Sequence, residues 1–115
     1  MKNESILNSI KTNIGMDEAY SAFDNDILVI VNSCFSTLNQ LGVGPDIPLH
    51  ISSTTNQWSE FTEDPALRNY AEHYITLKTR ILFDPPVNSF TLEALKTQAS
   101  ELEWRISIMR GESNE

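Results

Sequence analysis

The residues of this chain that could do chemistry are few and far apart. Its histidines are His50, in a predicted loop, and His73, on a predicted helix, and its single cysteine is Cys34. A zinc site normally needs three or four convergent ligands, and neither histidine stands at metal-ligand spacing from another histidine or cysteine. Cys34 lies in an uncharged apolar stretch, whereas a nucleophilic cysteine needs a partly exposed, electropositive site. We therefore predict no metal, no cofactor and no catalytic residue.

Two other patterns that can accompany chemistry have structural explanations. Residues 42–45 read Gly-Val-Gly-Pro, without the spacing or the lysine of a phosphate-binding loop, and predict the end of a helix. Glu101 and Glu103 are two apart and point to different sides of a helix, so they cannot act as an acid–base pair. Glu101 instead precedes Arg105 by four residues, the spacing of an ordinary pair on a helix surface. The sequence does not predict an enzyme.

Length and charge limit the classes that remain. With 115 residues the chain is one domain, and sixteen acids against eight bases give a net charge of −8. An acidic balance argues against general binding to nucleic-acid backbones, which requires lysine and arginine. No secretion signal is visible, and the longest aliphatic run, residues 27–31, is far too short to cross a bilayer. We expect a protein of the cytosol, or of an assembly built there.

The apolar periodicity predicts an all-α domain of four helices over residues 4–110, with flexible ends at 1–3 and 111–115. Asp24 and Asp64 are the predicted N-caps of the second and third helices. The segment between these helices, residues 46–64, is irregular, although the alternation of Ile47, Leu49 and Ile51 allows a short strand. The predicted helices cover residues 4–13, 24–41, 65–83 and 88 or 89 to 109.

The fourth predicted helix is apolar on two sides. One side is the stripe Leu92, Leu95, Ala99, Leu102, Ile106 and Met109. Opposite it lie Phe90, Thr97, Trp104 and Ile108, where a helix of a monomeric bundle is normally charged. Either a second subunit covers this side, or the chain ends or residues 46–64 fold over it.

The polar side of the second predicted helix carries no charge. No charged residue occurs between Ile27 and Pro45, and protein–protein contacts are depleted of charge. This side either contacts a neighbouring copy or is a solvated amide and hydroxyl surface. It comprises Asn32, Ser33, Ser36, Thr37, Asn39 and Gln40.

Lys78 projects into the apolar arc of the third predicted helix. Its methylenes can run to the surface while the ammonium group stays in water. The alternative is an ion pair with a carboxylate from another element.

Several blocks of the chain, taken in order, resemble the head–tail connector (adaptor) family of long-tailed bacteriophages. Each block alone is weakly specific, but together they run from about Ser5 to Ile108. They are the helix start at 24–27, the block Leu-Asn-Gln-Leu-Gly-Val-Gly-Pro at 38–45, Trp58 with Phe61, the run Leu-Lys-Thr-Arg-Ile-Leu-Phe-Asp-Pro-Pro at 77–86, Leu-Glu-Ala-Leu at 92–95 and Glu-Leu-Glu-Trp-Arg at 101–105.

The resemblance implies a structural virion protein without catalytic motif. Such a protein forms a ring beneath the portal, dodecameric where it matches the portal, and extends the DNA channel towards a stopper or tail-completion protein. Its implied partners are its own copies, the portal protein, that next component and genomic DNA that passes without specific binding. The resemblance places it at the head–tail interface of the virion, assembled in the bacterial cytoplasm and encoded by a phage or a prophage, with no membrane involved.

A head-to-tail ring needs two different adhesive faces on each subunit, and this requirement assigns candidate residues. Long loops in compact domains are commonly functional, which makes residues 46–64 the candidate docking loop for the portal or tail. Acids along the channel would let DNA slide without adhering. The candidate subunit-interface residues are Asn32, Ser36, Asn39, Gln40, Phe90, Trp104 and Ile108; the docking-loop residues are Ile47, Leu49, Ile51, Trp58 and Phe61; the channel-lining acids are Asp17, Glu18, Glu60 and Glu63.

Two other functions stay open at this point. One is a small acidic inhibitor that mimics DNA, which would need carboxylates spaced along one face, whereas here they gather in connections and at helix ends. The other is a helical regulatory subunit. A protein that stays monomeric at high concentration, even with a portal present, would favour these alternatives.

Overall fold

The computed structural model describes residues 4–113 and confirms the all-α prediction. None of the described residues forms a strand, so the alternation at residues 47–51 does not produce one; a single antiparallel bridge joins Ser5 to Gln57. The elements are α1 (Ile6–Asn13), α2 (Asp24–Gln40), the short 3₁₀ helix η1 (Trp58–Glu60), α3 (Pro65–Phe83) and α4 (Ser89–Ser113).

The helix ends follow local capping chemistry. Ser5 caps α1 by accepting a hydrogen bond from the backbone N–H of Asn8, and Gly15 follows the helix at φ 83°, the left-handed conformation that glycine adopts most easily. Asp64 caps α3 as predicted, accepting from the N–H of Ala66 at 3.0 Å. Helix α4 continues to Ser113, so residues 111–113, predicted as part of a flexible end, are helical; residues 1–3 and 114–115 lie outside the described part.

The predicted N-cap role of Asp24 is wrong. Helix α2 begins at Asp24 itself, and Phe23 occupies the N-cap position without a side-chain capping bond. The carboxylate of Asp24 lies 2.9 Å from Nζ of Lys11, a lysine whose side chain is fully buried. Because a buried ammonium group requires a compensating charge, Asp24 serves as its ion-pair partner.

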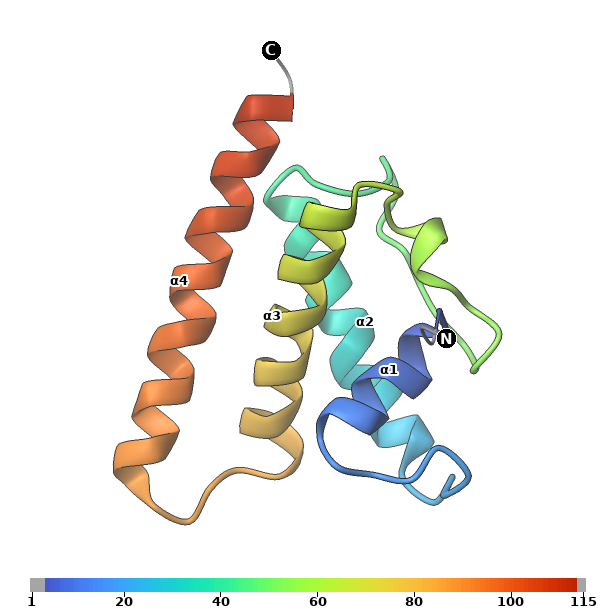
Figure 1. Ribbon diagram of the computed structural model, residues 1–115, viewed down its shortest axis with the longest axis vertical. Coiled ribbons are helices and arrows are strands. Elements are labelled where there is room, and N and C mark those ends of the chain that lie inside the picture. Colours follow the sequence, from blue (N-terminus) through green and yellow to red (C-terminus); the bar gives the residue numbers. More distant parts are fainter. Residues whose placement is uncertain (1–3, 114–115) are drawn as a thin grey trace.

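The helices divide into a body and an arm (Figure 1). Helices α1, α2 and α3 pack on one another, and the segment between α2 and α3 covers one side of them. Helix α4 returns antiparallel along α3, its main packing partner. The core therefore belongs chiefly to the body: Ile6, Leu7, Ile10, Ile27, Val31, Cys34, Phe35, Leu38, Val43, Ile51, Trp58, Phe61, Ala71, Tyr74, Ile75 and Leu77 are buried there, against Ala99, Leu102 and Ile106 of α4.

The irregular segment between α2 and α3 is fixed by two asparagines of α2. Asn32 accepts a hydrogen bond from the backbone N–H of Ile51 at 2.8 Å and donates one to its carbonyl at 3.0 Å. Asn39 donates to the carbonyls of Pro45 and Asp46, both at 3.1 Å. The segment is therefore an ordered cover of the body.

Candidate functional site

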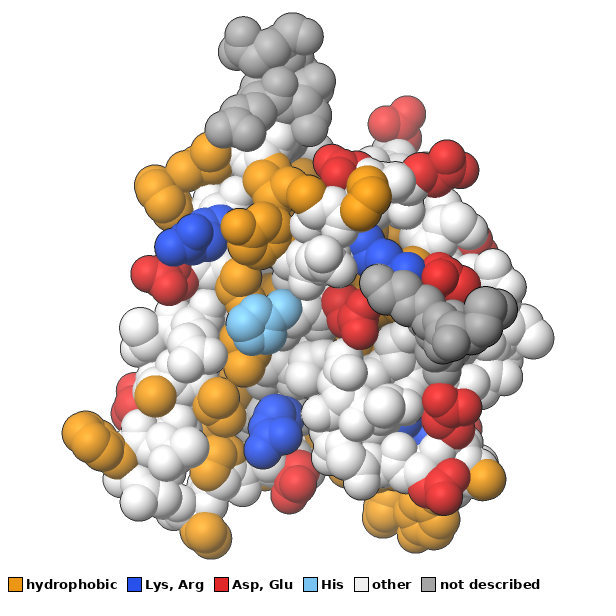
Figure 2. Space-filling model, in the orientation of Figure 1, with side chains coloured by type: hydrophobic (Ala, Val, Ile, Leu, Met, Phe, Trp, Pro, Cys, Tyr) orange, Lys and Arg blue, Asp and Glu red, His pale blue; other side chains and the backbone are white. Residues whose placement is uncertain are grey.

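The outer face of α4, defined as Phe90, Thr97, Trp104 and Ile108, is open to solvent. Phe90 is 87% exposed, Trp104 64% and Ile108 40%. Neither residues 46–64 nor any other described segment covers these side chains, which removes the alternative of intramolecular cover by the described chain. Figure 2 shows hydrophobic side chains reaching the surface on the α4 side of the molecule. Contact between subunits through this face remains a prediction.

The opposite side of α4 explains why the outer face stays open. Ala99, Leu102 and Ile106 are buried, and Tyr74 of α3 donates a hydrogen bond from its hydroxyl to Oε2 of Glu103 at 2.7 Å. Burial, followed by the bond to the Glu103 carboxylate, raises the pKa of Tyr74 well above its ordinary value, so this hydroxyl stays protonated. Only one side of α4 can face α3, and its outer apolar residues have no place in the body.

The uncharged side of α2 has an internal role at two of the predicted interface positions. Asn32 and Asn39 are half-buried and hold residues 45–51, as described above. Their amides are already engaged by backbone groups of the same chain, and their assignment to a subunit interface stays a prediction. Ser36 and Gln40 are exposed and remain candidates.

The predicted docking loop is largely a core element. Ile51 and Trp58 are each 1% exposed and Phe61 is 5% exposed, so the expectation that these side chains stand on a docking surface is corrected. Trp58 donates its indole N–H to Oγ of Ser9 at 3.1 Å, which satisfies the one polar atom of the buried ring. Only Ile47, 78% exposed, and the half-buried Leu49 can still face a partner.

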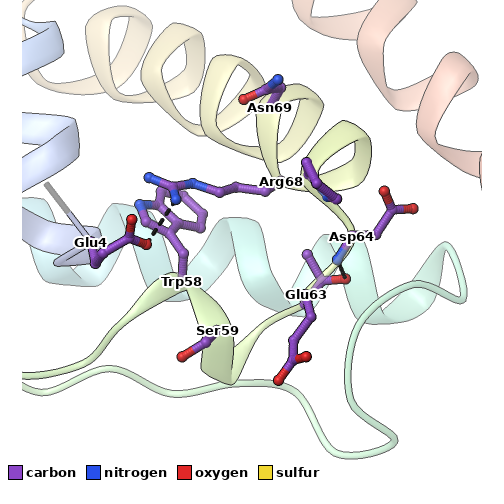
Figure 3. Close-up of a pocket in the computed structure, with 9 residues that line it drawn as sticks. Glu4, Trp58, Ser59, Glu63, Asp64, Arg68 and Asn69 are labelled. Atoms are coloured by element: carbon purple, nitrogen blue, oxygen red, sulfur yellow. Dashed lines mark hydrogen bonds and ion pairs between the residues drawn. The ribbon is translucent and has the colours of Figure 1, made fainter. Parts of the chain in front are cut away.

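A cleft of about 290 Å³ lies beside Trp58 (Figure 3). The guanidinium group of Arg68 stands over the indole ring at 5.4 Å from its centroid. The same group pairs with Glu4 at 2.9 Å and with Glu72 at 3.6 Å. Because its arginine is engaged with two carboxylates and a ring of the same chain, this cleft joins the start of the chain, η1 and α3 and is not a vacant anion site. Its lining residues are Glu4, Trp58, Ser59, Thr62, Glu63, Asp64, Pro65, Arg68 and Asn69.

The four predicted channel acids are exposed, but they lie at two ends of the body. Asp17 and Glu18 belong to the connection between α1 and α2, and Glu60 and Glu63 to the segment before α3, at the other end of the long axis (Figure 1). Glu60 accepts from the backbone N–H of Gln57 and from the amide of Asn56, and these bonds lower its pKa. Its carboxylate therefore stays charged while it caps η1.

The residues expected to be chemically inert lie in different surroundings. Cys34 is buried between α2 and its neighbours, and desolvation raises the pKa of its thiol to about 12, so it is a neutral core residue. His50 and His73 are exposed.

Lys78 is half-buried, and among the described side chains no ion pair involves it, which favours the surface-directed alternative. Among the side chains of residues 4–109, no three metal-binding groups come together.

Sequence reasoning missed the buried Lys11 and the aromatic group it supports. Lys11 donates from Nζ to the carbonyl of Glu18 at 2.9 Å and pairs with Asp24, and so fixes the connection between α1 and α2. This connection presents Tyr20, 50% exposed, and Phe23, 39% exposed. The available signal was the absence of any other basic residue near the acids of residues 17–26.

Comparison with known protein families identifies a match for this chain. A family model described as "Phage connector protein" matches residues 6–113, nearly the whole chain. No curated protein and no solved structure matches the chain significantly. None of the described helices combines the length and apolar character needed to span a lipid bilayer.

Proposed function

We propose, from the premise that this chain belongs to the phage connector protein family, that it joins the phage head to the tail as an oligomeric ring. Membership in this family supports a structural role in the phage, and the family is not known for enzymatic activity. The ring would sit between the portal protein and a stopper or tail-completion protein and extend the DNA channel. We place it in the virion, assembled in the bacterial cytoplasm from a phage or prophage gene, with twelve copies where it matches a dodecameric portal.

The observation that carries this proposal is the outer face of α4. Phe90 and Trp104 are large apolar side chains exposed on a chain whose net charge is −8. Exposed aromatic side chains of this kind anchor protein–protein contacts. An isolated monomer gains nothing from keeping them in water. If another protein surface covers this face, the exposed apolar side chains of α4 are buried and no longer lower the solubility of the protein.

The channel would be lined by acids that the ring turns inward. Glu60 and Glu63 are exposed beside η1, and the lowered pKa of Glu60 keeps its carboxylate ionised. Carboxylates repel the phosphate backbone and so prevent DNA from adhering as it passes. Reversal of both charges in Glu60→Lys/Glu63→Lys should leave assembly intact and slow DNA passage.

The proposal is tested by deleting the gene in its phage and complementing it. Without the protein, DNA-filled heads and free tails should accumulate unjoined, and added protein should co-sediment with heads that carry the portal and restore joining. Normal virions without the protein, or a protein that never binds portal-bearing heads, would sink the connector assignment and favour a small acidic inhibitor or regulatory subunit.

A further inference from the structure

The connection between α1 and α2 forms an open groove, lined by both apolar and acidic side chains, at one end of the molecule. We call it the Tyr20 groove; its volume is about 660 Å³ and its lining residues are Ile14, Gly15, Met16, Asp17, Ala19, Tyr20 and Asp84. The ring centroids of Tyr20 and Phe23 are 5.9 Å apart, and those of Phe23 and Phe83 are 5.3 Å apart. Aromatic surface therefore continues from the groove to the end of α3. Figure 2 shows hydrophobic side chains at this end of the molecule.

The groove is held in shape before any partner binds. The buried ammonium group of Lys11 donates to the carbonyl of Glu18 and pairs with Asp24, each at 2.9 Å. Asp17 accepts from the backbone N–H of Ala19 at 2.8 Å. A surface fixed in this way loses little conformational entropy when it is covered, which favours binding.

The rim of the groove is acidic. Asp17, Glu18 and Asp84 are exposed around it, and Arg80, one helical turn before Asp84, is the nearest exposed basic residue along α3. An occupant that fits this surface brings an aromatic or aliphatic side chain for the apolar wall and a cation for the rim.

This chemistry occurs on the chain itself, near the end of α4. Trp104 and Ile108 are exposed, and the exposed Arg105 lies between them in a shallow depression shared with Tyr70 and Met109. Among the described residues no ion pair engages Arg105, including the predicted pair with Glu101, whereas Lys11, Arg68 and Lys96 all have carboxylate partners. We call Trp104, Arg105 and Ile108 the α4 patch.

We propose that the Tyr20 groove of one copy receives the α4 patch of a second copy; this inference rests on the proposed ring. The α1–α2 connection and the C-terminal part of α4 lie towards opposite ends of the long axis (Figure 1). Joining the groove of one copy to the patch of the next leaves one free groove and one free patch at the ends of every open oligomer. Such a heterologous contact generates a ring when the rotation between successive copies closes. Copies with a net charge of −8 repel each other. An ion pair between Arg105 of one copy and the acidic rim of the next would offset this repulsion and fix the relative orientation of the two copies. Asp17 then belongs to the subunit contact, not to the channel.

Cysteine cross-linking on portal-bearing heads tests the contact directly. The double variant Ala19→Cys/Ile108→Cys should give a ladder of oligomers with a short bismaleimide, whereas each single variant should stay monomeric. Native Cys34 is buried and protonated, so it does not react. The matched control Ala19→Cys/Lys96→Cys, with the second cysteine elsewhere on exposed α4, should give no ladder. Dimers from Ile108→Cys alone would reveal a two-fold α4–α4 contact and overturn the proposal.

Charge reversal gives a second readout. Arg105→Glu and Asp84→Arg should each lower head–tail joining by at least about tenfold, and the double variant should recover most of it, because like charges opposed in an interface repel each other strongly. Lys96→Glu, the control on the same helix, should have little effect. If Arg105→Glu protein binds heads and joins tails normally, and the double cysteine variant gives no ladder, this contact is overturned while the connector function stands. Protein that never binds heads overturns both.

Discussion

The chain has two tryptophans, and they lie in regions of opposite character. Trp58 is 1% exposed, donates its indole N–H to Ser9 and carries Arg68 over its ring. Trp104, on α4, is 64% exposed. The first joins three elements of the body, and the second extends from an arm that packs chiefly on α3.

The difference shows that residue type alone does not separate core from contact surface. Trp58 stands in a polar, acidic sequence neighbourhood, yet its partners come from α1 and α3, far away in the chain. Trp104 stands on a helix with two apolar sides, yet only the side with Leu102 and Ile106 packs against the body. Burial depends on how many other elements reach a side chain, and α4 has one principal neighbour.

The largest effect on stability should come from Trp58→Ala. Truncation leaves a cavity in the body, so we expect a loss of about 3–5 kcal/mol in the free energy of unfolding. Trp58→Phe keeps a ring but removes the bond to Ser9 and should cost less. Urea unfolding followed by circular dichroism measures both; a loss below about 1 kcal/mol for Trp58→Ala would mean that the body does not depend on this ring.

Lys11→Met should rank second. It removes the buried cation and leaves the carboxylate of Asp24 without its partner. Because Asp24 is partly exposed, we expect a loss of about 2–3 kcal/mol, below the range for fully buried pairs. The double variant Lys11→Met/Asp24→Asn should recover part of the loss in the same unfolding experiment. If the double variant is as unstable as the single one, the carboxylate is not the cause.

Tyr74→Phe probes the boundary between body and arm. The change removes only the hydroxyl that donates to Glu103, and because this bond is only part-buried we expect a cost of about 1.5–2 kcal/mol, the lower part of the range for a hydrogen bond to a charged group. Because the bond joins α3 to α4, hydrogen exchange should accelerate in α4 more than in α1 or α2. Equal acceleration in all helices would show that body and arm unfold as one unit.

The sequence predicted the four helices because their apolar periodicity and their stop signals are local features. The cap at Asp64 and the stop at Gly15 were found in this way. The role of Asp24 was not, because its partner Lys11 comes from another helix and outweighs the local capping signal.

The candidate surfaces divided along the same line. For Phe90, Trp104 and Ile108 the sequence showed a second apolar side of the helix but left open whether the chain itself covers it; the structure leaves these side chains exposed. The burial of Ile51, Trp58 and Phe61 could not be predicted, because it depends on how Asn32 and Asn39 draw the segment onto the body. Non-local hydrogen bonds leave no periodic trace in a sequence.

The smallest effect on stability should come from Trp104→Ala. Its side chain is mostly in water already, so the free energy of unfolding should change by no more than about 0.5 kcal/mol, the range of ordinary surface substitutions. Oligomerisation on portal-bearing heads should nevertheless fall steeply, since an aromatic anchor at an interface often contributes more than about 2 kcal/mol to binding. Trp58→Ala and Trp104→Ala thus form a matched pair in which stability and assembly should respond in opposite order. If Trp104→Ala destabilises the monomer as much as Trp58→Ala does, Trp104 is a core residue of the monomer, and the argument that a partner covers the outer face fails.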